Sequence, residues 1–205
     1  MREEQVHIKN DKLLIEGLLF NASEDKGVVI CHPHSLMGGS MHNNVVQAIQ
    51  VAFAAEKYST LRFNFRGVGQ STGSYDEGRG EQEDILAVCK YFQSIGISKI
   101  TFAGYSFGSW VGSKIIERGD YPFAATIFIS PPISYFDFNF TILANKIDMI
   151  VCGNKDQFCD IGILKEQVNN VNLNLKIIPY TDHFFIEKEE ELINILRSTI
   201  NNEKN

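Results

Sequence analysis

Apolar residues occur along this chain in short continuous runs that alternate with helix-spaced patterns. Short runs rich in β-branched and aromatic residues predict strands, and apolar positions three and four residues apart predict helices. The expected strands cover residues 6–9, 13–20, 27–31, 59–65, 99–103, 124–129, 147–152 and 173–178. The expected helices cover residues 43–57, 81–94, 107–118, 161–169 and 188–200.

The order of these elements predicts an α/β fold. The first two strands flank Asn10-Asp11, a turn-forming pair, and this indicates an antiparallel hairpin at the N-terminus. The repeated strand–helix units that follow are typical of a mostly parallel sheet with helices on both faces. Functional residues are then expected at the carboxyl ends of the strands.

One strand-to-helix junction carries a serine between two glycines, Gly104-Tyr105-Ser106-Phe107-Gly108. Gly-x-Ser-x-Gly at such a junction is the nucleophile elbow, a sharp turn that lifts the serine hydroxyl above the sheet edge. The serine then lies at a helix N-terminus, whose free N–H groups favour developing negative charge.

The same pattern occurs a second time, at Gly69-Gln70-Ser71-Thr72-Gly73. This copy follows Arg66-Gly67-Val68 and leads into a turn-rich loop with no helix directly after it. The motif needs its strand–turn–helix context, so Ser106 is the predicted nucleophile and Ser71 the alternative.

A serine nucleophile needs a histidine base and an acid that orients it, in the chain order serine, acid, histidine. His183 is the single histidine after Ser106, and it lies between the last expected strand and the last expected helix. Asp156 directly follows the strand 147–152 and is the predicted acid. The other candidates are Asp148, placed inside that strand, Asp160, expected to cap a helix, and Asp182, whose side chain is expected to point away from the His183 ring.

An oxyanion hole needs two backbone N–H donors. One is predicted to be that of Phe107, and the other that of His34 or Ser35 in the loop after the strand 27–31. His32 and His34 are also a candidate metal pair, but no third ligand follows at zinc-hydrolase spacing, and no metal site is predicted.

These motifs together resemble the α/β-hydrolase superfamily, and in particular its small lidless bacterial esterases, which are related to dienelactone hydrolases and to the catalytic domains of prolyl oligopeptidases. The resemblance extends over nearly the whole chain and is carried by residues 32–34, 38–41, 61–71, 104–108 and 182–185. It implies a single domain over residues 1–205, an eight-stranded sheet and a triad of Ser106, Asp156 and His183. Dienelactone hydrolases use a cysteine where this chain has Ser106, so their lactone substrate does not carry over.

The connection 133–146 is too short for a lid domain. Its Phe136 and Phe138, with Leu36 and Met37, are candidates for an open acyl pocket, with core packing as the alternative. Arg66 is expected to pair with Glu81 or Asp84 and fix its loop, because the glycines beside it lack the spacing of a dinucleotide-binding loop.

Composition and charge exclude some classes of binding partner. The net charge of −6 and the lack of a Lys/Arg cluster speak against nucleic acid and anionic membranes. Four cysteines without Cys-x-x-Cys spacing and an N-terminus without a signal-peptide core predict reduced thiols in a cytoplasmic protein. The expected assembly is a monomer or a small homo-oligomer.

The sequence thus predicts a serine hydrolase that cleaves small to medium carboxylic esters through an acyl-enzyme, without a cofactor. The alternatives are a thioesterase or short-peptide hydrolase with the same triad, or a non-catalytic binding protein on this fold.

Overall fold

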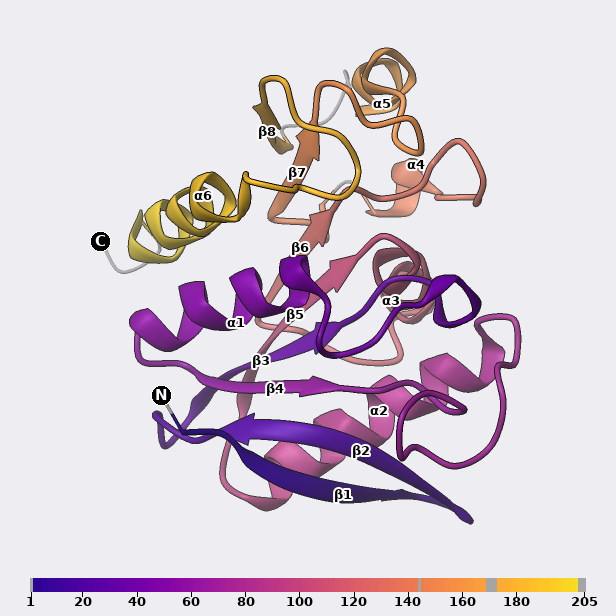
Figure 1. Ribbon diagram of the computed structural model, residues 1–205, viewed down its shortest axis with the longest axis vertical. Coiled ribbons are helices and arrows are strands. Elements are labelled where there is room, and N and C mark those ends of the chain that lie inside the picture. Colours follow the sequence, from indigo (N-terminus) through magenta and orange to yellow (C-terminus); the bar gives the residue numbers. More distant parts are fainter. Residues whose placement is uncertain (1, 144, 169–172, 203–205) are drawn as a thin grey trace.

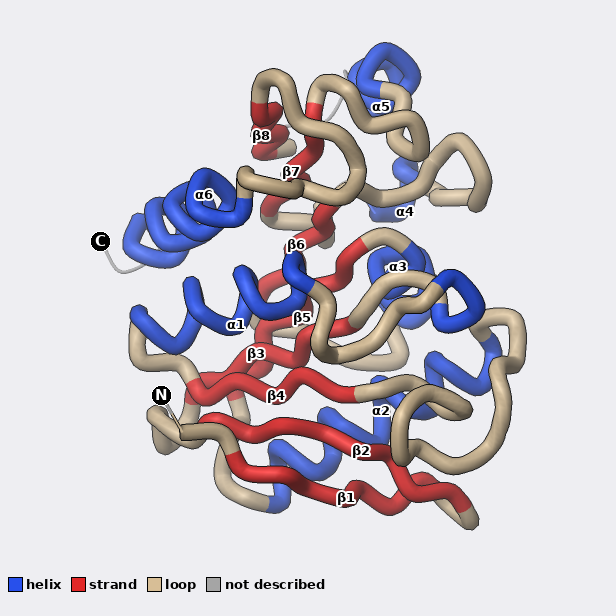
Figure 2. Tube along the Cα trace, viewed as in Figure 1, coloured by secondary structure: helices blue, strands red, loops and turns tan. Residues whose placement is uncertain are grey.

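The computed structural model describes residues 2–143, 145–168 and 173–202. In this part of the chain, eight strands form one sheet in the order β1-β2-β4-β3-β5-β6-β7-β8, which runs through the middle of the molecule (Figure 2). The strands are β1 (Glu4–Asn10), β2 (Leu13–Phe20), β3 (Lys26–Cys31), β4 (Ser59–Phe63), β5 (Lys99–Tyr105), β6 (Ala125–Ile129), β7 (Met149–Gly153) and β8 (Asn174–Ile178).

The sheet has the predicted mixture of strand directions. β1 pairs antiparallel with β2, and β2 pairs antiparallel with β4. All pairs from β4 through β3, β5, β6 and β7 to β8 are parallel. The prediction of a mostly parallel, eight-stranded sheet with an N-terminal hairpin is therefore confirmed.

Helices cover both faces of the sheet (Figure 1). On one face, α1 (Asn44–Ala55) and α6 (Glu189–Asn202) lie side by side. On the other face lie α2 (Arg79–Ser94) and α3 (Phe107–Arg118), followed by the shorter α4 (Phe140–Leu143) and α5 (Ile161–Val168). A short 3-10 helix, η1 (Ser35–Met37), follows β3.

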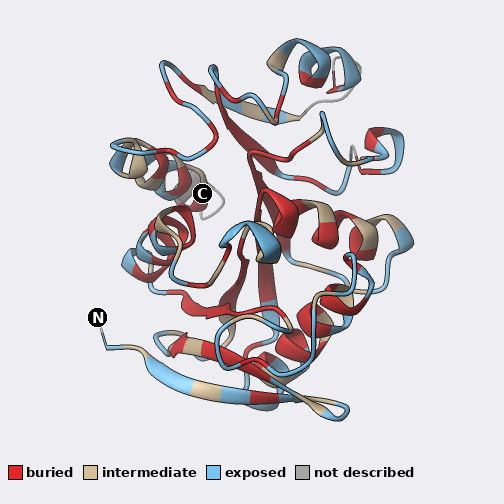
Figure 3. Ribbon diagram, turned by 45° about the vertical axis from the view of Figure 1, so that its right-hand side comes forward, coloured by how far each residue is buried: buried red, intermediate tan, exposed pale blue. Residues whose placement is uncertain are grey.

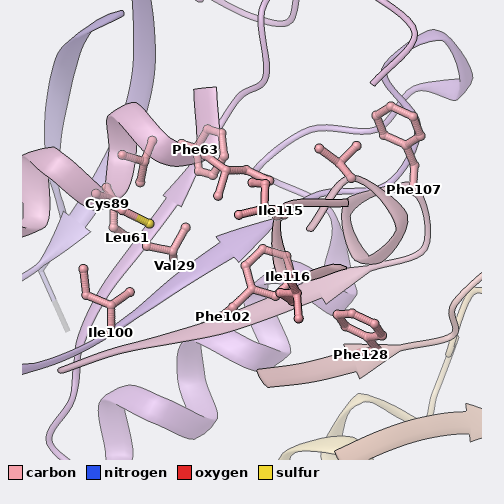
Figure 4. Packing of buried hydrophobic residues seen from close by; sticks show 14 of the residues in the cluster. Val29, Leu61, Phe63, Cys89, Ile100, Phe102, Phe107, Ile115, Ile116 and Phe128 are labelled. Carbon is pink, nitrogen blue, oxygen red and sulfur yellow. The ribbon is translucent and has the colours of Figure 1, made fainter. Parts of the chain in front are cut away.

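The core consists of two clusters, one on each side of the sheet. Successive strand residues point to opposite faces, so in β3 Val29 packs under α2 and α3 while Val28 packs under α1. Burial is densest where the sheet meets these helices (Figure 3). In the larger cluster, Phe102 of β5 lies beside Ile115 and Ile116 of α3 (Figure 4).

Several boundaries differ from the prediction for local reasons. The strand expected over 59–65 ends at Phe63, so residues 64 and 65 lie outside the sheet. Asn43 was expected to be the first residue of its helix, but it is the N-cap of α1. Its Oδ1 accepts from the Val45 N–H. The last strand was expected to start at residue 173, but β8 starts at Asn174. α5 is described to Val168, and residue 169 of the predicted helix 161–169 lies outside the described residues. The short elements η1 and α4 had no periodic signal to predict them.

The connection from β6 to β7 contains, in its described residues, only the single turn of α4. This confirms the prediction of a fold without a lid domain. No helix in the described ranges combines the length and the apolar character needed to cross a bilayer. All four cysteines are free and buried.

The loop after β4 is held by an ion pair between a partly buried arginine and a buried aspartate. The Nε and Nη2 of Arg66 donate to Asp84 of α2 at 3.1 and 2.8 Å, and the backbone N–H of Arg66 donates to the same carboxylate. The Asp84 side chain is 0% exposed. Of the two partners expected for Arg66, the structure selects Asp84, while Glu81 accepts from the N–H groups of Asp76 and Gly78.

We expect Asp84→Ala to lower the free energy of unfolding by about 2 kcal/mol, because it leaves the partly buried guanidinium and the backbone N–H of Arg66 without their acceptor. Asp120, which accepts from the exposed Arg118, is the matched control, and Asp120→Ala should cost less than about 1 kcal/mol. Urea unfolding of both variants measures the difference. Equal losses would contradict the structural role given to Asp84.

Candidate active site

The turn between β5 and α3 presents Ser106 at the carboxyl edge of the sheet. Ser106 has φ 52° and ψ −121°, a rare conformation for a non-glycine residue, and its N–H donates to the carbonyl of Ile129 at 2.9 Å. A Cβ on Gly104 would lie 2.6 Å from the Cα of Ser109, and one on Gly108 would lie 2.7 Å from the carbonyl oxygen of Cys31. Both glycines of the motif are therefore required for the tight turn.

A continuous hydrogen-bonded chain connects Ser106, His183 and Asp156. The Nε2 of His183 lies 2.9 Å from the Oγ of Ser106, and its Nδ1 lies 3.0 Å from each carboxylate oxygen of Asp156. All three residues are less than a tenth exposed. The three residues selected from the sequence come together, although they lie up to 77 positions apart.

The Asp156 side chain is oriented by its own loop, directly after β7. Besides His183, its Oδ1 accepts from the N–H groups of Phe158 at 2.9 Å and Cys159 at 3.1 Å. Because an ionised carboxylate only accepts hydrogen bonds, the His183 Nδ1 is the donor in this contact. The Nε2 lone pair is then directed at the Ser106 hydroxyl.

Tyr105, which the sequence analysis did not select, fixes the loop that carries His183. Its hydroxyl donates to the carbonyl of His183 at 2.8 Å, and the two rings lie 5.4 Å apart. Burial raises the pKa of Tyr105 above its ordinary value, so the hydroxyl stays a donor at neutral pH. Its position next to Ser106 is the signal that could have identified it.

The alternative residues have other partners. The Oγ of Ser71 donates to the carbonyl of Asn64 at 2.7 Å and accepts from the Glu16 N–H at 2.9 Å, which ties its loop to β2. Each competing aspartate accepts from a nearby backbone N–H: Asp148 from Thr126, Asp160 from Ile163 and Asp182 from Phe184. Asp148 precedes β7, so its placement inside the strand was wrong.

The two sides of the expected oxyanion hole also lie at this edge. The N–H of Phe107 is the first of α3 and has no acceptor within the helix. On the opposite side, His34 lines the cavity beside Ser106, whereas Ser35 is not among its lining residues. This placement favours His34 over Ser35.

No protein-family model matches the chain. An uncharacterised protein from Rickettsia prowazekii is 30% identical over 201 residues, which covers 91% of this chain and 84% of the relative. Among solved structures, an α/β serine hydrolase homologue from Coxiella burnetii is 31% identical, covers 97% of both chains and superposes with a TM-score of 0.86. The chain belongs to the α/β-hydrolase superfamily. A serine hydrolase without a lid from Xanthomonas campestris is 26% identical, with a TM-score of 0.85 over 98% of this chain and 95% of that one. These relatives support a hydrolase activity.

In this α/β-hydrolase, a cavity of about 490 Å³ opens above Ser106. Met37 and Phe136 line it as expected, but Leu36 and Phe138 do not. Leu36 is 72% exposed on η1, and Phe138 packs against Phe128 and Phe140 at the core. The predicted pocket is corrected accordingly.

Tyr135, another aromatic residue of the connection 133–146, also lines the cavity. Three further aromatic residues line it and were missed: Tyr105, Phe158 and Phe184. Tyr105, Phe158 and Phe184 each lie within two positions of Ser106, Asp156 or His183 in the sequence. Residues this close to the predicted site residues lie at the same sheet edge, and this proximity was the available signal. None of the residues lining the cavity is an aspartate, glutamate, lysine or arginine.

The two histidines of the β3 loop have structural partners. His32 is fully buried, its Nδ1 lies 2.6 Å from the Pro33 carbonyl and its Nε2 accepts from the Phe65 N–H at 3.0 Å. The Nδ1 of His34 accepts from the Leu36 N–H, and its Nε2 lies 3.2 Å from the Tyr75 hydroxyl. Within the described ranges, no three His, Cys, Asp or Glu side chains group as metal ligands would.

Burial lowers the pKa of His32 to about 4. Between pH 6.5 and 4 the unfolded chain therefore binds a proton at this residue that the folded chain lacks, so stability falls as the pH drops. The loss at pH 5 should be about 2 kcal/mol.

The measurement is urea unfolding at pH 7 and pH 5 for the natural protein and for His32→Gln, whose amide oxygen can accept from Phe65 but does not titrate. The variant should lack this part of the pH dependence, while all other groups contribute equally to both proteins. Identical pH dependence in the two proteins would show that His32 titrates normally.

Proposed function

We propose that this α/β-hydrolase cleaves carboxylic esters through an acyl-enzyme. The Oγ of Ser106 attacks the ester carbonyl carbon while the Nε2 of His183 takes the hydroxyl proton. The bond to the alcohol oxygen then breaks, and the alcohol leaves with that proton. Water, activated by the same imidazole, attacks the acyl-enzyme, releases the carboxylic acid and restores Ser106.

The observation that carries the proposal is the unbroken chain of hydrogen bonds from Asp156 through His183 to Ser106, at 3.0 and 2.9 Å. Asp156 holds the imidazole in the tautomer with Nδ1 protonated, which leaves Nε2 as the base. The His183 side of these hydrogen bonds is shielded from water, since His183 is 4% exposed. Hydrogen bonds of this kind are stronger in such surroundings than in water.

The negative oxygen formed by the attack is proposed to accept from the N–H groups of Phe107 and His34. The N-terminus of α3 adds its dipole to the first of these donors. Pro33, which has no N–H and a fixed φ, shapes the turn that presents the second donor.

The cavity favours esters over the alternative substrates. It is lined by no aspartate, glutamate, lysine or arginine side chain, which suits an uncharged ester better than a charged peptide or a thioester of an anionic carrier. All steps can be carried by these residues without a cofactor. A non-catalytic binding protein would not need the strained conformation at Ser106.

We further propose that residues 1–205 act as one domain, because both helix layers pack on one sheet. The four free, buried cysteines fit a protein of the cytoplasm.

We expect Ser106→Ala to lower kcat for p-nitrophenyl ester hydrolysis by about 10³-fold or more and to abolish labelling by a fluorophosphonate probe. Ser71→Ala is the matched control, since it alters the second copy of the motif but lies outside the cavity. It should keep most activity and full labelling. The reverse result would assign the nucleophile to Ser71.

We expect Asp156→Asn to lower kcat by about 10³- to 10⁴-fold, because an amide can stabilise the wrong tautomer of His183. Asp182→Asn changes the carboxylate beside His183 that bonds the Phe184 N–H instead, so it should retain activity. Steady-state kinetics, with circular dichroism to verify folding, measure both variants. A larger loss in Asp182→Asn would move the acid to that residue.

A further inference from the structure

Three aromatic side chains surround the part of the cavity next to His183. The ring of Phe158 lies 4.5 Å from the imidazole, centroid to centroid, and that of Phe184 lies 5.7 Å from it. The Tyr135 ring lies 5.3 Å from Phe158. We refer to Tyr135, Phe158 and Phe184 as the aromatic wall.

The chemistry of the proposed reaction assigns this wall to one part of the substrate. His183 must return its proton to the leaving oxygen, so the alcohol part of the ester lies within hydrogen-bond reach of Nε2. A separate group of lining rings consists of His34, Phe107 and Phe136, which contact one another. His34 belongs to the loop after β3, which we call the oxyanion loop. The aromatic wall therefore faces the alcohol part.

The core does not require the aromatic wall. None of its three residues belongs to either core cluster or to the residues packed against them. Tyr135 is 68% exposed and Phe184 is 48% exposed. Large apolar rings that stay open to water beside a reactive serine are a surface that a ligand can cover.

Hydrogen bonds fix the backbone of Phe158 and Phe184 in the aromatic wall without a ligand. The Phe158 N–H donates to Asp156, and its carbonyl accepts from the Ser134 N–H. The Phe184 N–H donates to Asp182, and its carbonyl accepts from the Asn44 side chain. A ligand ring thus meets a preformed surface and pays little to order it.

We propose that the alcohol part of the substrate carries an uncharged aromatic ring, which binds against Tyr135, Phe158 and Phe184. This inference rests on the proposed ester hydrolysis. Aromatic pairs with edge-to-face or offset geometry gain free energy beyond the burial of their area, which an aliphatic ring of the same carbon number does not.

The test compares 2-phenylethyl acetate with 2-cyclohexylethyl acetate. Both form the same acetyl-enzyme and release primary alcohols of similar acidity, so their kcat/KM ratio reports the ring alone. Cyclohexyl is the more apolar ring, and burial by itself would favour it. We expect the phenyl ester to be preferred by about five-fold.

Phe158→Leu and Tyr135→Leu should each bring this ratio towards one, whatever they do to the overall rate. Tyr180→Leu is the control, because Tyr180 is an exposed aromatic residue of the same His183 loop that does not line the cavity, and it should keep the ratio. A ratio of one or less in the natural protein, or an unchanged ratio in both wall variants, would overturn the inference.

The outcomes separate this inference from the proposed function. If neither acetate is hydrolysed and the fluorophosphonate probe does not label Ser106, then the proposed function itself is wrong. If the probe labels Ser106 but neither acetate is cleaved, the assignment of an arylalkyl alcohol is wrong while a serine nucleophile remains.

Discussion

The tight turn at Ser106 is the constraint on which the rest of the site depends. β5 must reverse into α3 within one residue, and this is possible only with the strained backbone of Ser106 and with glycine on both sides. The same close approach brings α3 onto Cys31 at the end of β3, where the oxyanion loop begins. One turn therefore places Ser106, the first N–H of α3 and the start of the loop after β3 together.

His183, the proposed base, is positioned through the residue that precedes Ser106. Tyr105 donates to the His183 carbonyl, so the segment that carries Ser106 also holds the loop that carries the imidazole. The same loop also approaches β7 closely. A Cβ on Gly153, the last residue of β7, would lie 2.1 Å from the Thr181 carbonyl oxygen. Ser106 and His183 are thus held by direct contacts between their neighbours, and not only by the hydrogen bond between them.

The fold and the positions of Ser106, Asp156 and His183 could be predicted because they depend on the spacing of apolar residues and on the order of strands and helices along the chain. The alternation of strand-like and helix-like spacing predicts a sheet covered by helices. Parallel strands bring their carboxyl ends to one edge of the sheet, and Ser106, Asp156 and His183 each follow a strand. The pocket could not be predicted in the same way. Leu36 lies in the three-residue helix η1 and Phe138 in an irregular segment. In neither place is there a repeating pattern that relates the position of a residue to the direction of its side chain.

The lack of a lid domain places a particular demand on the loops after β7 and β8. Where a lid closes over a substrate, its movement can assemble the site, whereas here the loops must hold the geometry in advance. Asp156 accepts from the Phe158 N–H, so the carboxylate that orients His183 and a ring of the aromatic wall are parts of one hydrogen-bonded turn. A substrate ring that packs on Phe158 therefore stabilises the same turn that fixes the acid. In this arrangement, binding energy from a part of the substrate that does not react can contribute to the orientation of the reacting groups.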